Sequence, residues 1–95
     1  MFIVLLTFAD KKDKAGQFME GHKSWLKRGF DDGVFLLAGS LQPNRGGGIL
    51  AHDISQSDLE ERVKADPFVA EEVVTAEVLE ITPSKADTRM ELLLG

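Results

Sequence analysis

Residues 33–51 read GVFLLAGSLQPNRGGGILA, and this stretch decides the fold that the sequence predicts. Two apolar runs, residues 34–38 and residues 48–52, lie on either side of a turn-forming segment at residues 42–47. Runs of branched and aromatic residues are typical of strands, whereas proline, asparagine and glycine are typical of the turns that join strands. The stretch therefore predicts two antiparallel strands that form a hairpin in the middle of the chain.

A strand and a helix are predicted before this hairpin. Residues 2–8, FIVLLTF, form an unbroken apolar run, as expected of a strand that is covered on both faces. After a charged segment at residues 10–14, apolar residues return at steps of three and four, which is the spacing of one face of an amphipathic helix. The residues on this face are Ala15, Phe18, His22, Trp25, Leu26 and Gly29. The turn residues at 31–33, Asp-Asp-Gly, end the helix.

A second helix and a fourth strand are predicted after the hairpin. The sequence SDLE at residues 57–60 matches a capping box, in which the Ser57 hydroxyl caps the helix and a glutamate follows three residues later. We expect this helix to bury Leu59 and Val63. Asp66-Pro67 interrupts it before one further helical turn, and residues 75–81 form the last predicted strand.

This order of elements, βαββαβ, predicts a ferredoxin-like α+β fold with a four-stranded antiparallel sheet and both helices on one face. Residues 1–84 form the predicted domain. Residues 85–95 form a C-terminal tail that is either at a dimer interface or disordered. The first two strands are apolar at consecutive positions, so the sheet face without helices also needs cover. A second copy would supply this cover, and we therefore expect a symmetric homodimer.

The composition limits the partners that the chain is expected to have. Its 95 residues include 11 Lys and Arg against 16 Asp and Glu, and the net charge of −5 argues against nucleic acids and anionic membranes as partners. The apolar opening is too short to span a bilayer. There is no cysteine and there are two histidines, so no metal or other cofactor is expected. We expect a soluble, cytoplasmic protein that binds a small molecule.

His22 is the first candidate for chemistry, because it lies on the buried face of the predicted first helix between Phe18 and Trp25. One interpretation is a core histidine that is hydrogen-bonded to a backbone carbonyl. The other is a general acid or base, since imidazole exchanges protons near neutral pH. The position of His22 on the helix leaves both interpretations open.

Asp66 is the second candidate. Aspartate before Pro67 is a favoured helix N-cap, with proline at the first helical position. The same carboxylate is also able to hold the His22 imidazole in one tautomer and stabilise its charged form. The two roles are compatible because a carboxylate has two oxygens. A contact between Asp66 and His22 is geometrically possible because both helices are expected on the same face of the sheet.

Ser40 and Arg45 are the candidates for binding a substrate. Ser40 lies at a strand end, where its side chain can point into a pocket, but no Gly-x-Ser-x-Gly motif marks it as a nucleophile. Arg45 is the best-placed cation for an anionic ligand. The glycines at 46–48 precede a strand rather than a helix, so they indicate a hairpin turn and not a phosphate-binding loop. His52, beside Asp53, is interpreted as solvated.

Taken in order, these segments resemble the YCII-related (YciI-like) family of the dimeric α+β barrel superfamily. The matching segments are MFIVLL at residues 1–6, GHKSWL at 21–26, GVFLLAGS at 33–40, RGGGIL at 45–50 and DPF at 66–68. The resemblance covers roughly residues 1–84 and implies a ferredoxin-like subunit that pairs into a barrel. It also implies an active site at His22 and Asp66. Relatives often carry tyrosines in the first and last strands, whereas this chain has none.

The sequence and the resemblance together predict a cofactor-independent enzyme that acts on a small, anionic organic molecule. His22 and Asp66 would carry out general acid–base chemistry, such as isomerisation or elimination (dehalogenation), with Ser40 and Arg45 binding the substrate. The alternative is a metabolite-binding or accessory subunit in which the His–Asp pair is a polar clamp without turnover. A third interpretation makes the pair purely structural.

Overall fold

The helices and strands follow the predicted order in the computed structural model, which describes residues 1–94. The strands are β1 (Phe2–Phe8), β2 (Phe35–Leu41), β3 (Gly46–Ala51) and β4 (Val74–Glu80). The helices are α1 (Ala15–Asp31), α2 (Gln56–Lys64) and the short α3 (Pro67–Ala70). Two 3-10 segments, η1 (Lys12–Lys14) and η2 (Thr88–Leu93), complete the described chain.

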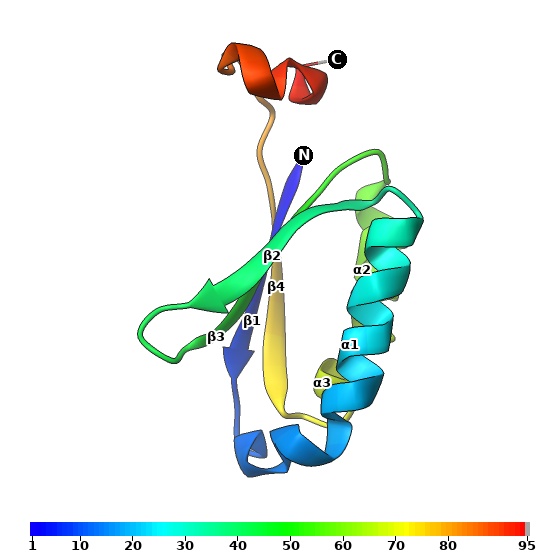
Figure 1. The fold of residues 1–95 in the computed structure, drawn as a ribbon, viewed down its shortest axis with the longest axis vertical. Helices are drawn as coiled ribbons and strands as arrows, with labels where there is room; N and C mark the ends of the chain where they lie inside the picture. The colour runs from blue at the N-terminus through cyan, green and yellow to red at the C-terminus, as the bar shows by residue number, and fades with distance from the viewer. Residues whose placement is uncertain (95) are drawn as a thin grey trace.

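The four strands form one sheet in the order β2-β3-β1-β4, and each neighbouring pair is antiparallel. The three α-helices lie together on one face of this sheet (Figure 1). The most apolar strand, β1, is a central strand, as its unbroken apolar run predicts. The structure confirms the ferredoxin-like α+β fold with a four-stranded antiparallel sheet.

The hydrophobic core lies between this sheet and the helices. Alternate side chains of a strand point to opposite faces, and in β1 the buried Phe2, Val4 and Leu6 point towards the helices. The helices contribute the buried side chains of Trp25, Leu59, Val63 and Phe68. Gly29 allows α1 to approach the sheet closely, because a Cβ atom at this position would overlap the Phe35 ring.

The opposite face of the sheet carries a row of apolar side chains with no helix over it. The strand register pairs Leu37 with Leu50, Leu50 with Ile3 and Ile3 with Leu79, so one cross-strand row runs over the whole sheet. Leu37 is 56% exposed and Leu79 is 42% exposed. The sequence predicted this bare apolar face. We call this row of four side chains the outer row.

The hairpin strands are longer than the sequence predicted, because the glycines belong to the strands and not to the turn. Gly46, Gly47 and Gly48 pair with Leu41, Ser40 and Gly39 of β2, so the loop shrinks to residues 42–45. Glycine has little strand preference of its own. Here β3 lies between β1 and β2, and hydrogen bonding on both edges outweighs that weakness.

The predicted cap of α2 at Ser57 is wrong, because the helix begins earlier. Its N-cap is Ser55, whose hydroxyl accepts a hydrogen bond from the backbone N–H of Asp58 at 3.1 Å. The sequence offers a hydroxyl followed three residues later by an acidic residue at both positions. The earlier serine caps the helix and leaves Ser57 inside the first turn.

The C-terminal segment leaves the sheet after β4 and carries η2 away from the domain (Figure 1). Its apolar side chains Met90, Leu92 and Leu94 are exposed. The last backbone hydrogen bond between this end and the sheet is from Ile81 N–H to the carbonyl of Met1, at 2.9 Å. Gly95, the last residue of the predicted tail, lies outside the described residues. Between residues 1 and 94 no helix has the length and apolar character needed to cross a membrane.

Candidate active site

The imidazole of His22 packs against two aromatic rings. The Phe68 ring stacks on it, with centroids 4.1 Å apart and 6° between the ring planes. The Trp25 ring, three residues further along α1, also stacks with it, with centroids 5.8 Å apart and 26° between the planes. Trp25 is itself fixed, because its Nε1 donates to the Arg62 carbonyl at 2.9 Å. Packing therefore sets the orientation of the imidazole.

A carboxylate from α3 completes this arrangement. Nδ1 of His22 lies 2.8 Å from Oδ1 of Asp66, which is fully buried. The same Oδ1 accepts a hydrogen bond from the backbone N–H of Phe68 at 3.0 Å, so Asp66 is also the N-cap of α3, with Pro67 at the start of the helix. Asp66 therefore caps α3 and contacts His22 at the same time, through one oxygen and not through two. His22 is bonded to this carboxylate and not to a backbone carbonyl.

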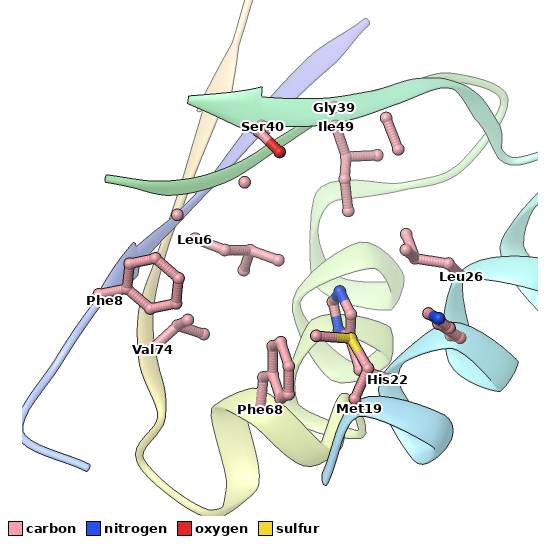
Figure 2. Close-up of a pocket in the computed structure, with 15 residues that line it drawn as sticks. Leu6, Phe8, Met19, His22, Leu26, Gly39, Ser40, Ile49, Phe68 and Val74 are labelled. Carbon is pink, nitrogen blue, oxygen red and sulfur yellow. The ribbon is translucent and has the colours of Figure 1, made fainter. Parts of the chain in front are cut away.

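This hydrogen bond determines which nitrogen of His22 is free. An ionised carboxylate can only accept, so Nδ1 carries the hydrogen and the lone pair of the neutral ring lies on Nε2. Among residues 1–94 nothing hydrogen-bonds to Nε2, and Figure 2 shows a ring nitrogen of His22 directed into the adjacent hollow. The side chain is 14% exposed. The free nitrogen is therefore able to exchange a proton with a bound molecule.

The second oxygen of Asp66 shapes the electrostatics of this pair. Oδ2 is buried and has no hydrogen-bond partner in the described chain. A buried carboxylate with an unpaired oxygen is costly, and a positive charge beside it lowers that cost. The His22 ring lies directly against this carboxylate, with its Nδ1 2.8 Å from Oδ1.

Gly21 brings α3 close enough for this contact. A Cβ atom at position 21 would lie 3.0 Å from Cγ of Pro67, which is tighter than ordinary van der Waals contact. The absence of a side chain there lets the first turn of α3 pack directly on α1, next to His22. The sequence contains this signal as a glycine immediately before the histidine.

His22 faces a cavity of about 350 Å³ between the helices and the sheet. Figure 2 shows His22, Met19 and Leu26 on the side of α1, with Ser40 across the cavity on β2. The cavity is lined by Leu6, Phe8, Met19, His22, Lys23, Leu26, Ala38, Gly39, Ser40, Gly46, Gly47, Gly48, Ile49, Phe68 and Val74. Most of this lining is apolar. Ligand sites are typically concave, mostly apolar and carry a few polar groups, and this volume is at the lower end of their range.

The structure brings three of the four predicted site residues together. His22 and Ser40 line the cavity, and Asp66 lies behind His22. Arg45 does not line the cavity. It is an exposed residue of the loop between β2 and β3, where its backbone bonds to Leu41 and Phe8.

His52 lies outside the cavity lining. Its Nδ1 is 3.6 Å from the carboxylate of Asp53, and its backbone N–H donates to the carbonyl of Val34 at 2.9 Å. It therefore belongs to the end of β3 and not to the candidate site.

Lys23 is the cavity residue that the sequence did not single out. It directly follows His22, so it lies about 100° further around α1, and it lines the cavity while it is exposed to solvent. In the sequence, the signal for Lys23 was its position beside the candidate histidine.

No group of three or more His, Cys, Asp or Glu side chains within residues 1–94 is arranged to hold a metal ion.

The strand order, the antiparallel pairing and the single helical layer define a protein of the ferredoxin-like α+β class. No family model and no curated protein matches the chain. Among solved structures, the chain is similar to 5-chloro-2-hydroxyhydroquinone dehydrochlorinase from Burkholderia phenoliruptrix AC1100, in complex with 2,5-dihydroxybenzoquinone. The TM-score is 0.68 at 12% sequence identity, over 85% of this chain and 93% of that chain.

This similarity shows the shared fold. The dimeric α+β barrel superfamily that the sequence resemblance implied stays a prediction. The narrower YCII-related assignment has no matching family model.

Proposed function

We propose that this protein is an enzyme that moves a proton on a small organic molecule bound in the cavity, without a cofactor. His22 is the general acid or base, and Asp66 orients it and stabilises its charged form. One observation carries this proposal: the His22 ring is bonded at 2.8 Å to a fully buried carboxylate, while its other nitrogen is free beside a cavity. A purely structural pair would not need that cavity.

The geometry suits the removal of a proton from an already acidic C–H or O–H bond. Nε2 accepts the proton, and the imidazolium is stabilised by Asp66. In an elimination, the electron pair of the broken bond forms a new double bond as a leaving group such as chloride departs. In an isomerisation, His22 returns the proton to another carbon. The Ser40 hydroxyl, across the cavity, is placed to donate a hydrogen bond to a substrate oxygen.

The fold neighbour makes elimination the first reaction to examine. Its name describes the loss of hydrogen chloride from a chlorinated hydroxyhydroquinone, and its bound ligand is a dihydroxybenzoquinone. Such single-ring molecules are of the size that a cavity of about 350 Å³ accommodates. We therefore propose single-ring halogenated phenols and activated halolactones as the substrate classes for this chain.

The decisive variant is His22→Asn. The asparagine amide nitrogen can replace Nδ1 as the donor to Asp66, whereas no group replaces Nε2 as the base. We expect folding to be kept and turnover of the substrate to fall about 100- to 10,000-fold, the usual contribution of a general acid or base. Chloride release and product spectra measure the effect on a panel of halogenated hydroquinones and lactones.

Two outcomes would contradict the proposal. Turnover that survives in His22→Asn would remove His22 from the chemistry. Saturable binding of a ligand that is recovered unchanged, at every pH from 5 to 9, would favour the accessory binding role instead. Gly16→Ala is a suitable control, because position 16 is open space on the same helix.

We also propose that two copies pair through the outer row into a homodimer. An exposed apolar row across four strands is unfavourable in water, and a second sheet would cover it. The helices and the cavity are on the other face, so pairing leaves the approach to His22 from the helical side unchanged.

A further inference from the structure

We propose that Lys23 binds the charged group of the substrate, and that the substrates are compact organic molecules with a single negative charge. This inference rests on the proposed function, because it assumes that the reacting molecule occupies the cavity beside His22. It assigns to Lys23 the role that the sequence gave to Arg45.

The charges along the cavity wall support this assignment. The lining contains Lys23 and His22 but no aspartate or glutamate. Asp66, the nearest carboxylate to His22, is fully buried behind the ring. The wall that a ligand meets within the described chain therefore offers positive charge or neutral surface. An anion is favoured there over a cation.

Lys23 is also available for a ligand. Three lysines of the described chain form ion pairs: Lys27 with Asp31 at 2.7 Å, Lys11 with Glu72 at 3.2 Å and Lys64 with Glu61 at 3.4 Å. Lys12, Lys14 and Lys85 are unpaired in the described chain, like Lys23, but they do not line the cavity. Lys23 has no acidic side chain within ion-pair distance among residues 1–94. Lys23 is exposed and also lines the cavity, and its long, flexible side chain keeps the ammonium in water within reach of a ligand there.

The net charge of the protein does not overturn this local preference. At −5 the whole chain repels anions at a distance. Salt screens such exposed charges beyond about 8 Å at physiological ionic strength. A ligand inside the cavity is within reach of Lys23 and therefore responds mainly to it.

The inner end of the cavity limits the substrate to one charge. The side chains there, such as Leu6, Ile49 and Val74, are apolar. A second negative group placed against them would lose its hydration without gaining a partner, which is strongly unfavourable. The favoured ligand has its anionic group at Lys23 and a ring or chain of carbon atoms against the inner wall.

The experiment compares three probes with the same ring: benzoate, benzamide and phthalate, which carry one, no and two negative charges. Trp25 is the single tryptophan of the chain, and its ring centroid is 5.8 Å from that of His22, so its fluorescence reports on the cavity. We expect benzoate to bind more tightly than both other probes. Lys23→Gln should weaken benzoate binding about three- to tenfold and leave benzamide unchanged, the scale of a partly exposed charge contact.

Two further variants separate charge from structure. Lys23→Arg should restore the preference for benzoate. Lys27→Gln should keep it, because Lys27 lies on the same helix outside the cavity lining. The inference is overturned if Lys23→Gln still prefers benzoate over benzamide, if phthalate binds as tightly as benzoate, or if the parent protein binds no benzoate.

The readout also distinguishes this inference from the proposed function. His22→Asn should keep the preference for benzoate while it loses turnover, because the cation at position 23 remains. Loss of turnover without any effect of Lys23→Gln on binding would leave the function standing and remove the role of Lys23. A preference for benzoate that depends on Lys23, together with full turnover in His22→Asn, would keep the role of Lys23 and remove His22 from the proposed function.

Discussion

The sheet face that the helices cover has large side chains at one end and small ones at the other. At one end the rings of Phe2, Phe35 and Trp25 are buried, and the Trp25 and Phe35 centroids are 5.2 Å apart in an edge-on contact. At the other end the neighbouring strands present Ser40 and Gly47, which pair across the sheet, and the cavity opens above them.

This difference shows that the cavity exists because the side chains at this end are small, and not because the sheet is interrupted. The ladder between β2 and β3 runs through both ends, and its one register shift, between Phe35 and Leu37, lies at the closed end and not beside the cavity. Large rings fill the space under α1 at the closed end, whereas small residues leave it empty at the open end. The same helix, α1, therefore contributes Trp25 to the core and His22 to the candidate site, and the two residues are about one turn apart.

The largest effect on the fold of a subunit is expected at the closed end. Phe35→Ala should lower the free energy of unfolding by about 3–5 kcal/mol, because Phe35 is buried and removal of its ring leaves a cavity. Phe8→Ala at the open end should cost clearly less, because Phe8 is only half-buried and already borders empty space. Urea denaturation measures both variants, and equal losses would contradict the comparison.

A smaller effect on the fold, with a large effect on binding, is expected at the open end. A Cβ atom at position 47 would have one neighbour, the Gly39 carbonyl oxygen at 3.4 Å, so a side chain fits and fills the cavity. Gly47→Val should change the free energy of unfolding by less than about 1 kcal/mol, since valine suits a strand. It should weaken benzoate binding at least about tenfold.

The binding effect at position 47 should grow with the size of the side chain. Gly47→Ala is expected to fall between the parent and Gly47→Val in a fluorescence titration with benzoate. Undiminished binding by Gly47→Val would place the ligand elsewhere than in this cavity.

The smallest effect on a single subunit is expected on the outer face. Leu37→Lys should barely change the fold of the subunit, because Leu37 is 56% exposed there. It should separate the proposed dimer, because it places a charge within the outer row. Light scattering should give twice the chain mass of 10.4 kDa for the parent and a single mass for the variant.

The dimer prediction has a control on the other side of the molecule. Glu61→Lys, on α2, also adds a positive charge, but to the helical layer, and it should leave the mass unchanged. A parent protein that is monomeric at micromolar concentration would contradict the proposed homodimer.

The fold was predictable from the sequence wherever side-chain pattern decides structure. The apolar run at residues 2–8 has the same bounds as β1, and the Asp66-Pro67 cap starts α3 as predicted. The bounds of β2 and β3 were less predictable, because glycine carries no pattern and the neighbouring strands decide its pairing. Ser55 and Ser57 offer similar caps, and the local sequence does not rank them.

The candidate site was predictable in its central pair but not in its cation. His22 was recognisable as a polar residue on a buried helix face, and Asp66 as a carboxylate on the neighbouring helix. Choosing between Arg45 and Lys23 requires the position of α1 over the sheet, which is a tertiary property. Lys23 stands at the edge of α1 above the cavity, whereas the loop that carries Arg45 extends past the end of the sheet.

The double use of Asp66 Oδ1 makes the candidate pair depend on the docking of α3 against α1. This oxygen accepts bonds from the ring of His22, 44 residues earlier in the chain, and from the first turn of α3. The bond to His22 is lost if α3 detaches from α1, whereas the local cap bond to Phe68 can persist. Folding intermediates that lack a docked α3 would therefore lack the proposed proton-exchanging pair.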